Sequence, residues 1–282
     1  MTIRQALQWA KVQLKYACER PLFEAELLLA HHLGQARTYL ILHEEEILKD
    51  ACDYEVLVAR RVAHEPMEYI TGRVSFYDME LSITAGALIP RPETELLVEE
   101  SAQIIRQEGL TRIVEIGIGS GAISIALARL FPRLQIVASD ISREALAVAG
   151  DNVAAFGLEG QITLRETSLL EGIETPLEMI VSNPPYIARH TPLAPNVAAY
   201  EPHTALYSEE QGDELLKKII LLARERGVRY LACEMGYDQK QSISEFVKGM
   251  GDYSISFYRD LAGLDRGFIL RFTDEKVNEY TY

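Results

Sequence analysis

The spacing of apolar residues over the first 64 positions predicts helices. Apolar side chains recur every three or four residues, as in Ala10 and Leu14, which is the period of an amphipathic helix. Pro21 and Gly34 bracket the next run, because proline is favoured in a first helical turn and glycine just after a last one. A further run covers residues 53–65. The pattern therefore predicts a bundle of about four helices.

From position 68 onward the apolar period falls to two, which is typical of strands. Residues 69–73 and 79–83 flank a turn near Tyr77, so the sequence predicts a hairpin there. Two prolines further on make the chain stiff and extended. We therefore expect a helical domain of residues 1–67 followed by a hairpin linker of residues 68–90.

The rest of the chain, residues 91–282, alternates short apolar runs with helical ones. The predicted strands are 112–116, 135–139, 162–165, 179–182, 229–233, 254–258 and 268–272. The predicted helices are 122–130, 142–156, 213–226 and 239–249. This alternation predicts an α/β fold with a mostly parallel sheet covered on both faces, in which a ligand binds at the carboxyl ends of the strands.

Composition narrows the class of protein. The 282 residues are 48% hydrophobic and 25% charged, which is typical of a globular protein. No apolar stretch reaches membrane-spanning length and no secretory signal is visible, so we expect no membrane association. Three widely separated cysteines favour a cytoplasmic location. The net charge of −14 disfavours a nucleic-acid substrate, because phosphate contacts require a basic surface.

The first candidate site is a glycine loop, Gly117-Ile118-Gly119-Ser120-Gly121, placed between a predicted strand and its helix. Glycines allow a sharp turn and bring a ligand against backbone N–H groups. The spacing differs from that of dinucleotide-binding loops and of phosphate-binding P-loops. A close-packed turn without a ligand is the alternative interpretation.

Asp140 is the second candidate, at the end of the next predicted strand. An acid at this place accepts both hydroxyls of a ribose. It is also a common helix N-cap, a role that Ser142 can share. The loop and the acid together favour a nucleoside ligand, and without pyrophosphate spacing S-adenosylmethionine fits better than a dinucleotide.

The third candidate is Asn183-Pro184-Pro185-Tyr186, directly after the apolar run 179–182. The prolines remove backbone donors and fix the chain, so that carbonyl oxygens point into the pocket without partners. The side-chain oxygen of Asn183 and the carbonyl of Pro184 can then accept both hydrogens of an –NH2 group, on which Tyr186 stacks. Such a grip aims the nitrogen lone pair at a methyl group. A proline-rich turn is the alternative.

Other polar residues give weaker indications. Arg91 and Glu93 could reach the cofactor or pair with each other, and Glu201 and Asp213 could border the site or lie in a loop. The six histidines and three cysteines show no metal-binding spacing, so we expect no metal.

These motifs resemble the protein-glutamine methyltransferases of the HemK/PrmC family over nearly the whole chain. The matching segments are 26–31 with 37–40, 66–72, 89–95, 182–186, 200–202 with 205–206, and 260–266. The resemblance implies a Rossmann-like class I S-adenosylmethionine-dependent methyltransferase fold with an N-terminal helical domain. The implied acceptor is the side-chain amide of the glutamine in the Gly-Gly-Gln loop of class 1 peptide chain release factors, which the helical domain would dock.

Carried over by position, the resemblance assigns residues to both substrates. The cofactor would be held by Gly117, Ile118, Gly119, Ser120, Gly121, Asp140, Ser168, Asn183, Arg91 and Glu115. The glutamine would be held by Asn183, Pro184, Pro185 and Tyr186, of which Asn183, Pro184 and Tyr186 would be catalytic. Glu115 replaces the family's usual aspartate, and Thr167, Ser168 and Leu169 stand where the family often has an acid and an aromatic residue.

Two rival functions share parts of this pattern. An amino-methyltransferase acting on adenine or guanine in nucleic acid would use the same Asn-Pro-Pro-Tyr segment, with Tyr186 stacked on a flipped base. The net charge of −14 argues against it. A binding module without turnover is the second rival, although binding alone does not require paired amide acceptors.

Overall fold

The computed structural model describes residues 1–251 and 253–272. The chain divides into two compact units: the first comprises Met1–Arg73 with Leu193–Tyr200, and the second Val74–Pro192 with Glu201–Tyr282. Residues 252 and 273–282 of the predicted 91–282 domain lie outside the described part.

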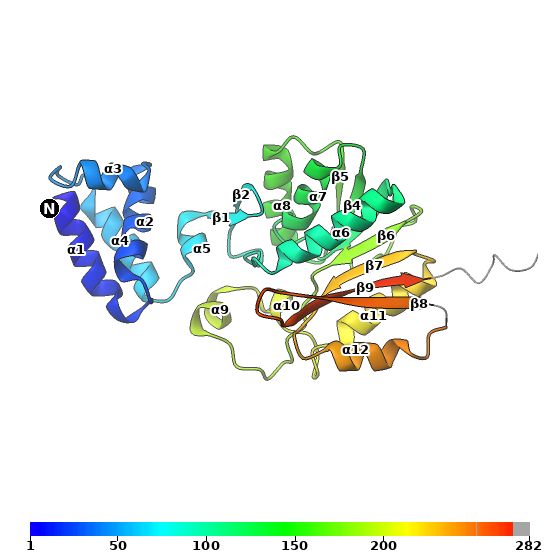
Figure 1. Ribbon diagram of the computed structural model, residues 1–282. Coiled ribbons are helices and arrows are strands. Elements are labelled where there is room, and N and C mark those ends of the chain that lie inside the picture. The colour runs from blue at the N-terminus through cyan, green and yellow to red at the C-terminus, as the bar shows by residue number, and fades with distance from the viewer. Residues whose placement is uncertain (252, 273–282) are drawn as a thin grey trace, which may run out of the picture. The chain divides into compact units, whose positions relative to one another are not determined.

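The first unit contains a helical bundle, as predicted (Figure 1). Its elements are α1 (Ile3–Gln13), η1 (Leu14–Tyr16), α2 (Pro21–Leu33), α3 (Arg37–Leu42), α4 (Ala51–Val62) and α5 (Met67–Thr71). Thr2 and Gln5 form a capping box at the start of α1, and Gly34 ends α2 with a φ of 62°. The core between these helices is apolar, with Leu28 and Tyr54 fully buried.

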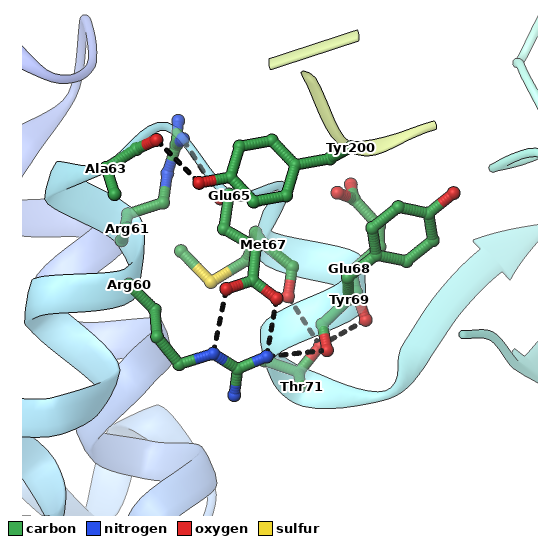
Figure 2. Close-up of polar contacts among 9 residues, drawn as sticks. All are labelled: Arg60, Arg61, Ala63, Glu65, Met67, Glu68, Tyr69, Thr71 and Tyr200. Carbon is green, nitrogen blue, oxygen red and sulfur yellow. Dashed lines mark hydrogen bonds and ion pairs between the residues drawn. The ribbon is translucent and has the colours of Figure 1, made fainter. Parts of the chain in front are cut away.

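The first unit also includes a segment from late in the sequence, α9 (Pro195–Tyr200). The Tyr200 hydroxyl donates to the carbonyl of Ala63, just beyond α4, at 2.8 Å. Figure 2 shows Tyr200 beside this end of α4, where Arg60 pairs with Glu65 at 2.5 Å. The sequence analysis did not anticipate that this segment clusters with the helical bundle.

The predicted hairpin is present but begins later than expected. Its strands are β1 (Arg73–Phe76) and β2 (Met79–Ser82), and the turn at Tyr77 is confirmed. The prediction of a strand over 69–73 is wrong, because most of that run lies in α5, whose Tyr69 and Ile70 are buried. Gly72 ends α5 with a φ of 71°, a conformation that favours glycine.

The second unit is built on the predicted sheet, with strand order β5-β4-β3-β6-β7-β9-β8. The strands are β3 (Arg112–Ile116), β4 (Gln135–Asp140), β5 (Ile162–Glu166), β6 (Met179–Ser182), β7 (Tyr230–Glu234), β8 (Tyr253–Arg259) and β9 (Asp265–Phe272). The first five are parallel, and β9 is antiparallel to both of its neighbours. The predicted α/β class is confirmed.

Helices cover both faces of this sheet (Figure 1). The helices of this unit are α6 (Thr94–Glu108), α7 (Ala122–Leu130), α8 (Arg143–Ala155), α10 (His203–Leu206), α11 (Glu214–Glu225) and α12 (Lys240–Val247). Apolar residues of α11 and α12 pack with Val114 and Ile116 on one face. On the other, Glu115 of β3 contacts Ser124 of α7. Helices α6, α9 and α10 are not among the helices that the sequence analysis predicted.

The site lies where the sheet order reverses. After β3 the chain continues to β4 and β5 on one side, then crosses to β6 and β7 on the other. The carboxyl ends of β3, β4 and β6 therefore meet at a topological switch point, the usual ligand position in such sheets.

Candidate active site

A cavity of about 320 Å³ opens at this switch point, and all the residues that line it belong to the second unit. The glycine loop, Asp140, Ser168 and the first three residues of the Asn-Pro-Pro-Tyr segment line it together. Three segments that are far apart in the sequence thus meet around one space. Its volume is in the range of small-molecule sites.

The glycine loop is held in a left-handed backbone conformation. Gly117, Gly119 and Gly121 have φ angles of 77°, 55° and 88°, which residues with a β-carbon rarely adopt. A β-carbon at Gly117 or Gly119 would meet nothing within 4 Å. These two glycines are therefore required by backbone conformation, and they leave an open backbone surface at the cavity.

Most N–H groups of the glycine loop are hydrogen-bonded within the protein. Four of them donate within the protein: Gly117 and Ile118 to the Ser139 carbonyl at 2.8 and 3.0 Å, Gly119 to Asp140 Oδ2 at 3.1 Å, and Gly121 to the Ile118 carbonyl at 2.9 Å. Of the five N–H groups in the loop, only that of Ser120, which lines the cavity, has no acceptor in the described part of the chain, and its contact with a ligand stays a prediction. Because its glycines have no side chains, the loop also allows a ligand to approach the backbone closely.

Asp140 ends β4 and presents its carboxylate at the cavity. One oxygen accepts from Gly119 N and the other from Ser142 N at 2.9 Å, so each keeps a lone pair for a ligand. The N-cap of α8 is Ser142, whose hydroxyl accepts from Ala145 N. Asp140 is thus free of the capping role that was its alternative interpretation.

Glu115 lies on the cavity wall with its side chain buried. Ser124 donates to one carboxyl oxygen, while the other, Oε1, has no partner among the described residues. Burial raises the pKa of Glu115 to about 8, because a charged carboxylate is poorly solvated there. At neutral pH this group is mostly a neutral acid.

The segment after β5 forms another part of the wall, with Thr167, Ser168 and Leu169 lining the cavity. Its backbone is fixed by Ser139, whose hydroxyl donates to the Leu169 carbonyl at 2.8 Å. Leu169 has a φ of 52°, unusual for a residue with a branched side chain. The predicted contact of Ser168 with the cofactor stays a prediction.

The Asn-Pro-Pro-Tyr segment leaves two oxygens without donors. The side-chain nitrogen of Asn183 donates to Thr94 Oγ1 at 3.1 Å, which sets the direction of the amide. Within the described part of the chain, no donor occupies Asn183 Oδ1 or the carbonyl of Pro184. Both residues line the cavity. The role of these two oxygens as paired acceptors for an –NH2 group stays a prediction.

Tyr186 is placed differently from its neighbours. It is not among the residues that line the cavity, and it packs against the apolar core. Its hydroxyl donates to Glu234 Oε1 at 2.9 Å, and its carbonyl accepts from Gln239 Nε2 at 2.8 Å. Burial and the Glu234 carboxyl raise the pKa of Tyr186, so its phenol is neutral. The hydroxyl and the backbone carbonyl of Tyr186 are therefore both hydrogen-bonded within the protein.

Arg91 and Glu93 do not pair with each other, so that alternative is wrong. Arg91 pairs with Glu201 at 2.5 Å, and Glu93 with Arg266 at 3.6 Å. Glu201 is buried and also accepts from Ile89 N at 3.3 Å. Arg91 is not among the cavity-lining residues. The predicted role of Arg91 in cofactor binding has no direct geometric support.

Three polar residues at this site were missed by the sequence analysis. Asn152 of α8 donates to the Ser120 carbonyl at 2.9 Å and also bonds the backbone of β2, so it supports the glycine loop. Thr94 holds Asn183, and Glu234 holds Tyr186. Glu234 directly follows a predicted strand, so the rule that found Asp140 could have found it too.

Other classes of site are absent from the described residues. No cluster of three or more metal-ligating side chains occurs in residues 1–251 and 253–272. In the same ranges, no helix combines the length and the apolar character needed to cross a bilayer. Cys18, Cys52 and Cys233 are free thiols.

Comparison with known families gives two matches that follow one another along the chain. Residues 5–72 match the PrmC N-terminal domain, and residues 92–199 match the methyltransferase small domain. One match falls in the first unit and the other begins within the second.

Curated relatives match nearly the whole chain. A release factor glutamine methyltransferase from Koribacter versatilis is 34% identical over 94% of this chain and 97% of its own length. Proteins with the same name from Moorella thermoacetica and Vibrio cholerae are 35% and 33% identical, over 95% and 98% of this chain and 98% and 99% of their own lengths. The similarity therefore includes both units.

Solved structures share the fold at low identity. The hMettl16 catalytic domain in complex with MAT2A 3′UTR hairpin 1 is 17% identical, with a TM-score of 0.58 over 80% of this chain and 82% of that one. The N-terminal domain of human METTL16 in complex with SAH is 18% identical, with a TM-score of 0.52 over 69% of this chain and 76% of that one. These likenesses confirm the methyltransferase fold.

Proposed function

Because the chain belongs to the family of release factor glutamine methyltransferases, we propose that it methylates the side-chain amide of a glutamine in class 1 peptide chain release factors. The glutamine is the one in the Gly-Gly-Gln loop, and the methyl donor is S-adenosylmethionine. The observation that carries the proposal is the pair of oxygens at Asn183 and Pro184, which line the cavity and lack donors among the described residues.

The cavity fits the proposed cofactor. Its wall is mainly apolar, which suits a flat adenine ring, and Asp140 keeps a lone pair on each oxygen for ribose hydroxyls. The open faces of Gly117 and Gly119 permit close approach of the ligand. Ser168 and Glu115 are further polar groups on the wall. When bound, S-adenosylmethionine supplies an electrophilic methyl carbon.

The oxygens of Asn183 and Pro184 orient the substrate amide. An amide nitrogen is a poor nucleophile because its lone pair is delocalised into the carbonyl. Two acceptors that hold both hydrogens of the –NH2 group aim the nitrogen toward the methyl carbon. These hydrogen bonds strengthen as the nitrogen becomes pyramidal and positively charged, so they stabilise the transition state more than the bound substrate.

A strong base is not required at this site. The –NH2 hydrogens become acidic only as the new N–C bond forms, and one is then released as a proton to water, which leaves a neutral N-methyl amide. The Asn-Pro-Pro-Tyr segment carries no carboxylate or imidazole, which agrees with this order of events.

The helical domain has a separate proposed role, the docking of the release factor. All residues that line the cavity lie between 86 and 218, and none belongs to the first unit. The end of α3 exposes Ile41 and Leu42, which are 72% and 80% exposed. Exposed apolar side chains of this kind are typical of protein-binding surfaces.

This docking role is tested by changing the surface without shortening the chain. Ile41→Asp with Leu42→Asp should raise KM for intact release factor and leave methylation of a short Gly-Gly-Gln peptide unchanged. Equal effects on the protein and the peptide would contradict docking.

The nucleic-acid alternative has weaker support. Three relatives that match 94–98% of the chain are named release factor glutamine methyltransferases, and the chain carries a net charge of −14. The RNA complex among the structural neighbours is only 17% identical, so its similarity concerns the fold alone.

We also propose a cytoplasmic location, which the three free thiols support.

Mass spectrometry of release factors incubated with enzyme and S-adenosylmethionine tests the proposed function. The tryptic peptide that contains Gly-Gly-Gln should gain one methyl group on its glutamine side chain. Methylation of naked RNA or DNA with no change in the release factor would overturn the proposal.

A further inference from the structure

Gln239 has a buried side-chain amide that takes no part in capping the helix it precedes. The residue is the N-cap of α12 and is 8% exposed, yet its side chain makes no capping hydrogen bond. Glutamine is not among the residues favoured at an N-cap, and a buried amide costs free energy unless its polar atoms find partners. The partners of this amide therefore indicate what the residue does.

Both polar atoms of the Gln239 amide are hydrogen-bonded to backbone groups. Its Oε1 accepts from Gly236 N at 2.9 Å, in the connection from β7 to α12, and its Nε2 donates to the carbonyl of Tyr186 at 2.8 Å. These two partners fix the orientation of the amide, because an N–H requires an acceptor and a carbonyl requires a donor. One side chain thus connects the chain after β7 to the last residue of the Asn-Pro-Pro-Tyr segment.

The Tyr186 carbonyl is also closely packed against Gly212. Gly212 has a φ of 88°, and a β-carbon built there would lie 2.5 Å from this carbonyl oxygen and 2.8 Å from Ala188 N. A side chain at Gly212 therefore requires the backbone around Tyr186 to move. Two contacts from outside the segment, the Gln239 amide and the Gly212 backbone, define where the Tyr186 carbonyl lies.

The Asn-Pro-Pro-Tyr segment transmits this constraint because it is stiff. The rings of Pro184 and Pro185 fix φ, and a residue that precedes a proline is restricted in ψ. Few torsions are therefore free between Asn183, which directly follows β6, and Tyr186. With β6 fixing one end of the segment, the position of the Tyr186 carbonyl sets the direction of the Pro184 carbonyl at the cavity.

We propose that Gln239 is a positioning residue for methyl transfer, which sets the direction of the Pro184 carbonyl by holding the carbonyl of Tyr186. The inference rests on the proposed function, because it assigns a cause to the acceptor geometry that this function requires. Gln239 is not among the residues that line the cavity, so it acts through the backbone of the segment and not on a substrate.

The test compares Gln239→Glu with Gln241→Glu in the full-length enzyme, with a Gly-Gly-Gln peptide as substrate. A carboxylate at position 239 keeps an acceptor for Gly236 N but cannot donate to the Tyr186 carbonyl. Gln241 is the matched control, because it lies on the same helix and its Nε2 donates to Glu245 at 2.9 Å. We expect kcat per cofactor-binding site to fall by about 10²-fold for Gln239→Glu, as for a misplaced reacting group, and to stay within about twofold for Gln241→Glu.

Gln239→Met removes the same donor without adding a charge. Methionine has nearly the length of glutamine, so the variant keeps most of the packing and loses both hydrogen bonds of the amide. Its kcat should fall by at least about tenfold. This variant decides the outcome if Gln239→Glu does not fold. A folded Gln239→Met enzyme with a kcat within about twofold of the wild type would overturn the inference.

Cofactor binding distinguishes positioning from a general structural role. The glycine loop and Asp140 are held by hydrogen bonds of their own, so the Kd of Gln239→Met for S-adenosylhomocysteine should stay within about threefold of the wild-type value. A loss of cofactor affinity as large as the loss of kcat would show a general loosening of the site and would also overturn the inference.

Gly212 tests the same carbonyl through its other contact. Gly212→Ala places a β-carbon against the Tyr186 carbonyl and should lower kcat by at least about tenfold. Gly263→Ala is its control: the φ of 81° gives similar backbone strain, but a β-carbon there would meet nothing within 4 Å. Its kcat should stay within about twofold of the wild type. Equal values of kcat in the two variants would contradict the inference.

The outcome is separable from that of the proposed function. If the wild-type enzyme does not methylate the glutamine peptide, the proposed function fails. If the wild type is active and the Gln239 variants are equally active, only the positioning role fails.

Discussion

The two sides of the cavity are built by different means. On the cofactor side, the glycine loop is held by left-handed backbone angles and by bonds between backbone groups, with Asp140 at its edge. On the acceptor side, the Asn-Pro-Pro-Tyr segment is held by side chains that come from α6 and β7. One side depends on local backbone conformation, and the other on polar side chains brought together by the fold.

Despite this difference, oxygen acceptors occur on both sides. The fold uses donors on each side, namely loop N–H groups on one and the Asn183 nitrogen on the other. Oxygens of Asp140, Asn183 and Pro184 keep unshared lone pairs. Such a site suits ligands that carry hydroxyl or –NH2 donors and a positive charge. A sulfonium cofactor has both features, and a primary amide has the –NH2 donor.

The largest expected effect is on the acceptor side. Asn183→Ala removes one of the two oxygens, so kcat should fall by about 10³-fold, as for loss of an oxyanion-hole donor. The Kd for S-adenosylhomocysteine should change by no more than a factor of about three, since the glycine loop and Asp140 remain. Steady-state kinetics and calorimetry measure the two. A variant with near-normal turnover would remove the basis of the mechanism.

A pH-dependent effect is expected from Glu115 on the cofactor side. Its pKa is about 8 in the folded protein against 4.5 for a free glutamate, so the folded state binds more protons between these values. The free energy of unfolding of the cofactor-free protein should therefore fall as pH rises from about 4.5 to 8, by up to about 4 kcal/mol.

Glu115→Gln keeps an acceptor for Ser124 and cannot titrate, so this variant should lack that pH slope. Urea unfolding at several pH values measures it. Identical slopes in the two proteins would show that Glu115 is not protonated at neutral pH in the folded state.

The next effect concerns Arg91, which is not among the residues that line the cavity. Arg91→Met removes the partner of the buried Glu201 carboxyl, so the protein should lose about 2–3 kcal/mol of stability, reduced from the value for a fully buried pair because Arg91 is partly exposed. Thermal unfolding measures the loss. If Arg91 instead contacts the cofactor, the variant will bind S-adenosylhomocysteine much more weakly while stability changes little.

The smallest effect is expected for the glycine loop. Gly119→Ala places a β-carbon on a backbone with a φ of 55°, which costs about 1–2 kcal/mol and should weaken cofactor binding about tenfold. Gly109→Ala is the control, because Gly109 has a φ of 64° and open surroundings at the end of α6. It should lose similar stability without weaker cofactor binding. Equal cofactor affinities in the two variants would contradict the role of the loop.

The sequence predicted best what local patterns determine. The strands at 112–116 and 179–182 and the helix at 122–130 were predicted with the bounds that the structure has, because apolar runs and glycines mark their ends. The glycine loop was also located by local spacing. The hydrogen bonds of its N–H groups could not be predicted in this way, because the Ser139 carbonyl that accepts from two of them belongs to another strand.

The acceptor side shows where local patterns do not suffice. Asn183 and Pro184 could be identified because two adjacent prolines are a local feature, but Thr94 and Glu234 contact this segment only through the fold. The same holds for Tyr200, whose bond to Ala63 joins residues 137 positions apart. The strand expected over 69–73 failed because alternating apolar residues also fit one short, half-buried helix.

A crystal structure of the enzyme with S-adenosylhomocysteine and a Gly-Gly-Gln peptide tests the central claim most directly. We predict that the glutamine side-chain nitrogen lies within hydrogen-bonding distance of both Asn183 Oδ1 and the Pro184 carbonyl oxygen, with its lone pair directed at the sulfur. A complex in which other protein donors occupy these two oxygens, or in which the glutamine binds elsewhere, would contradict the account.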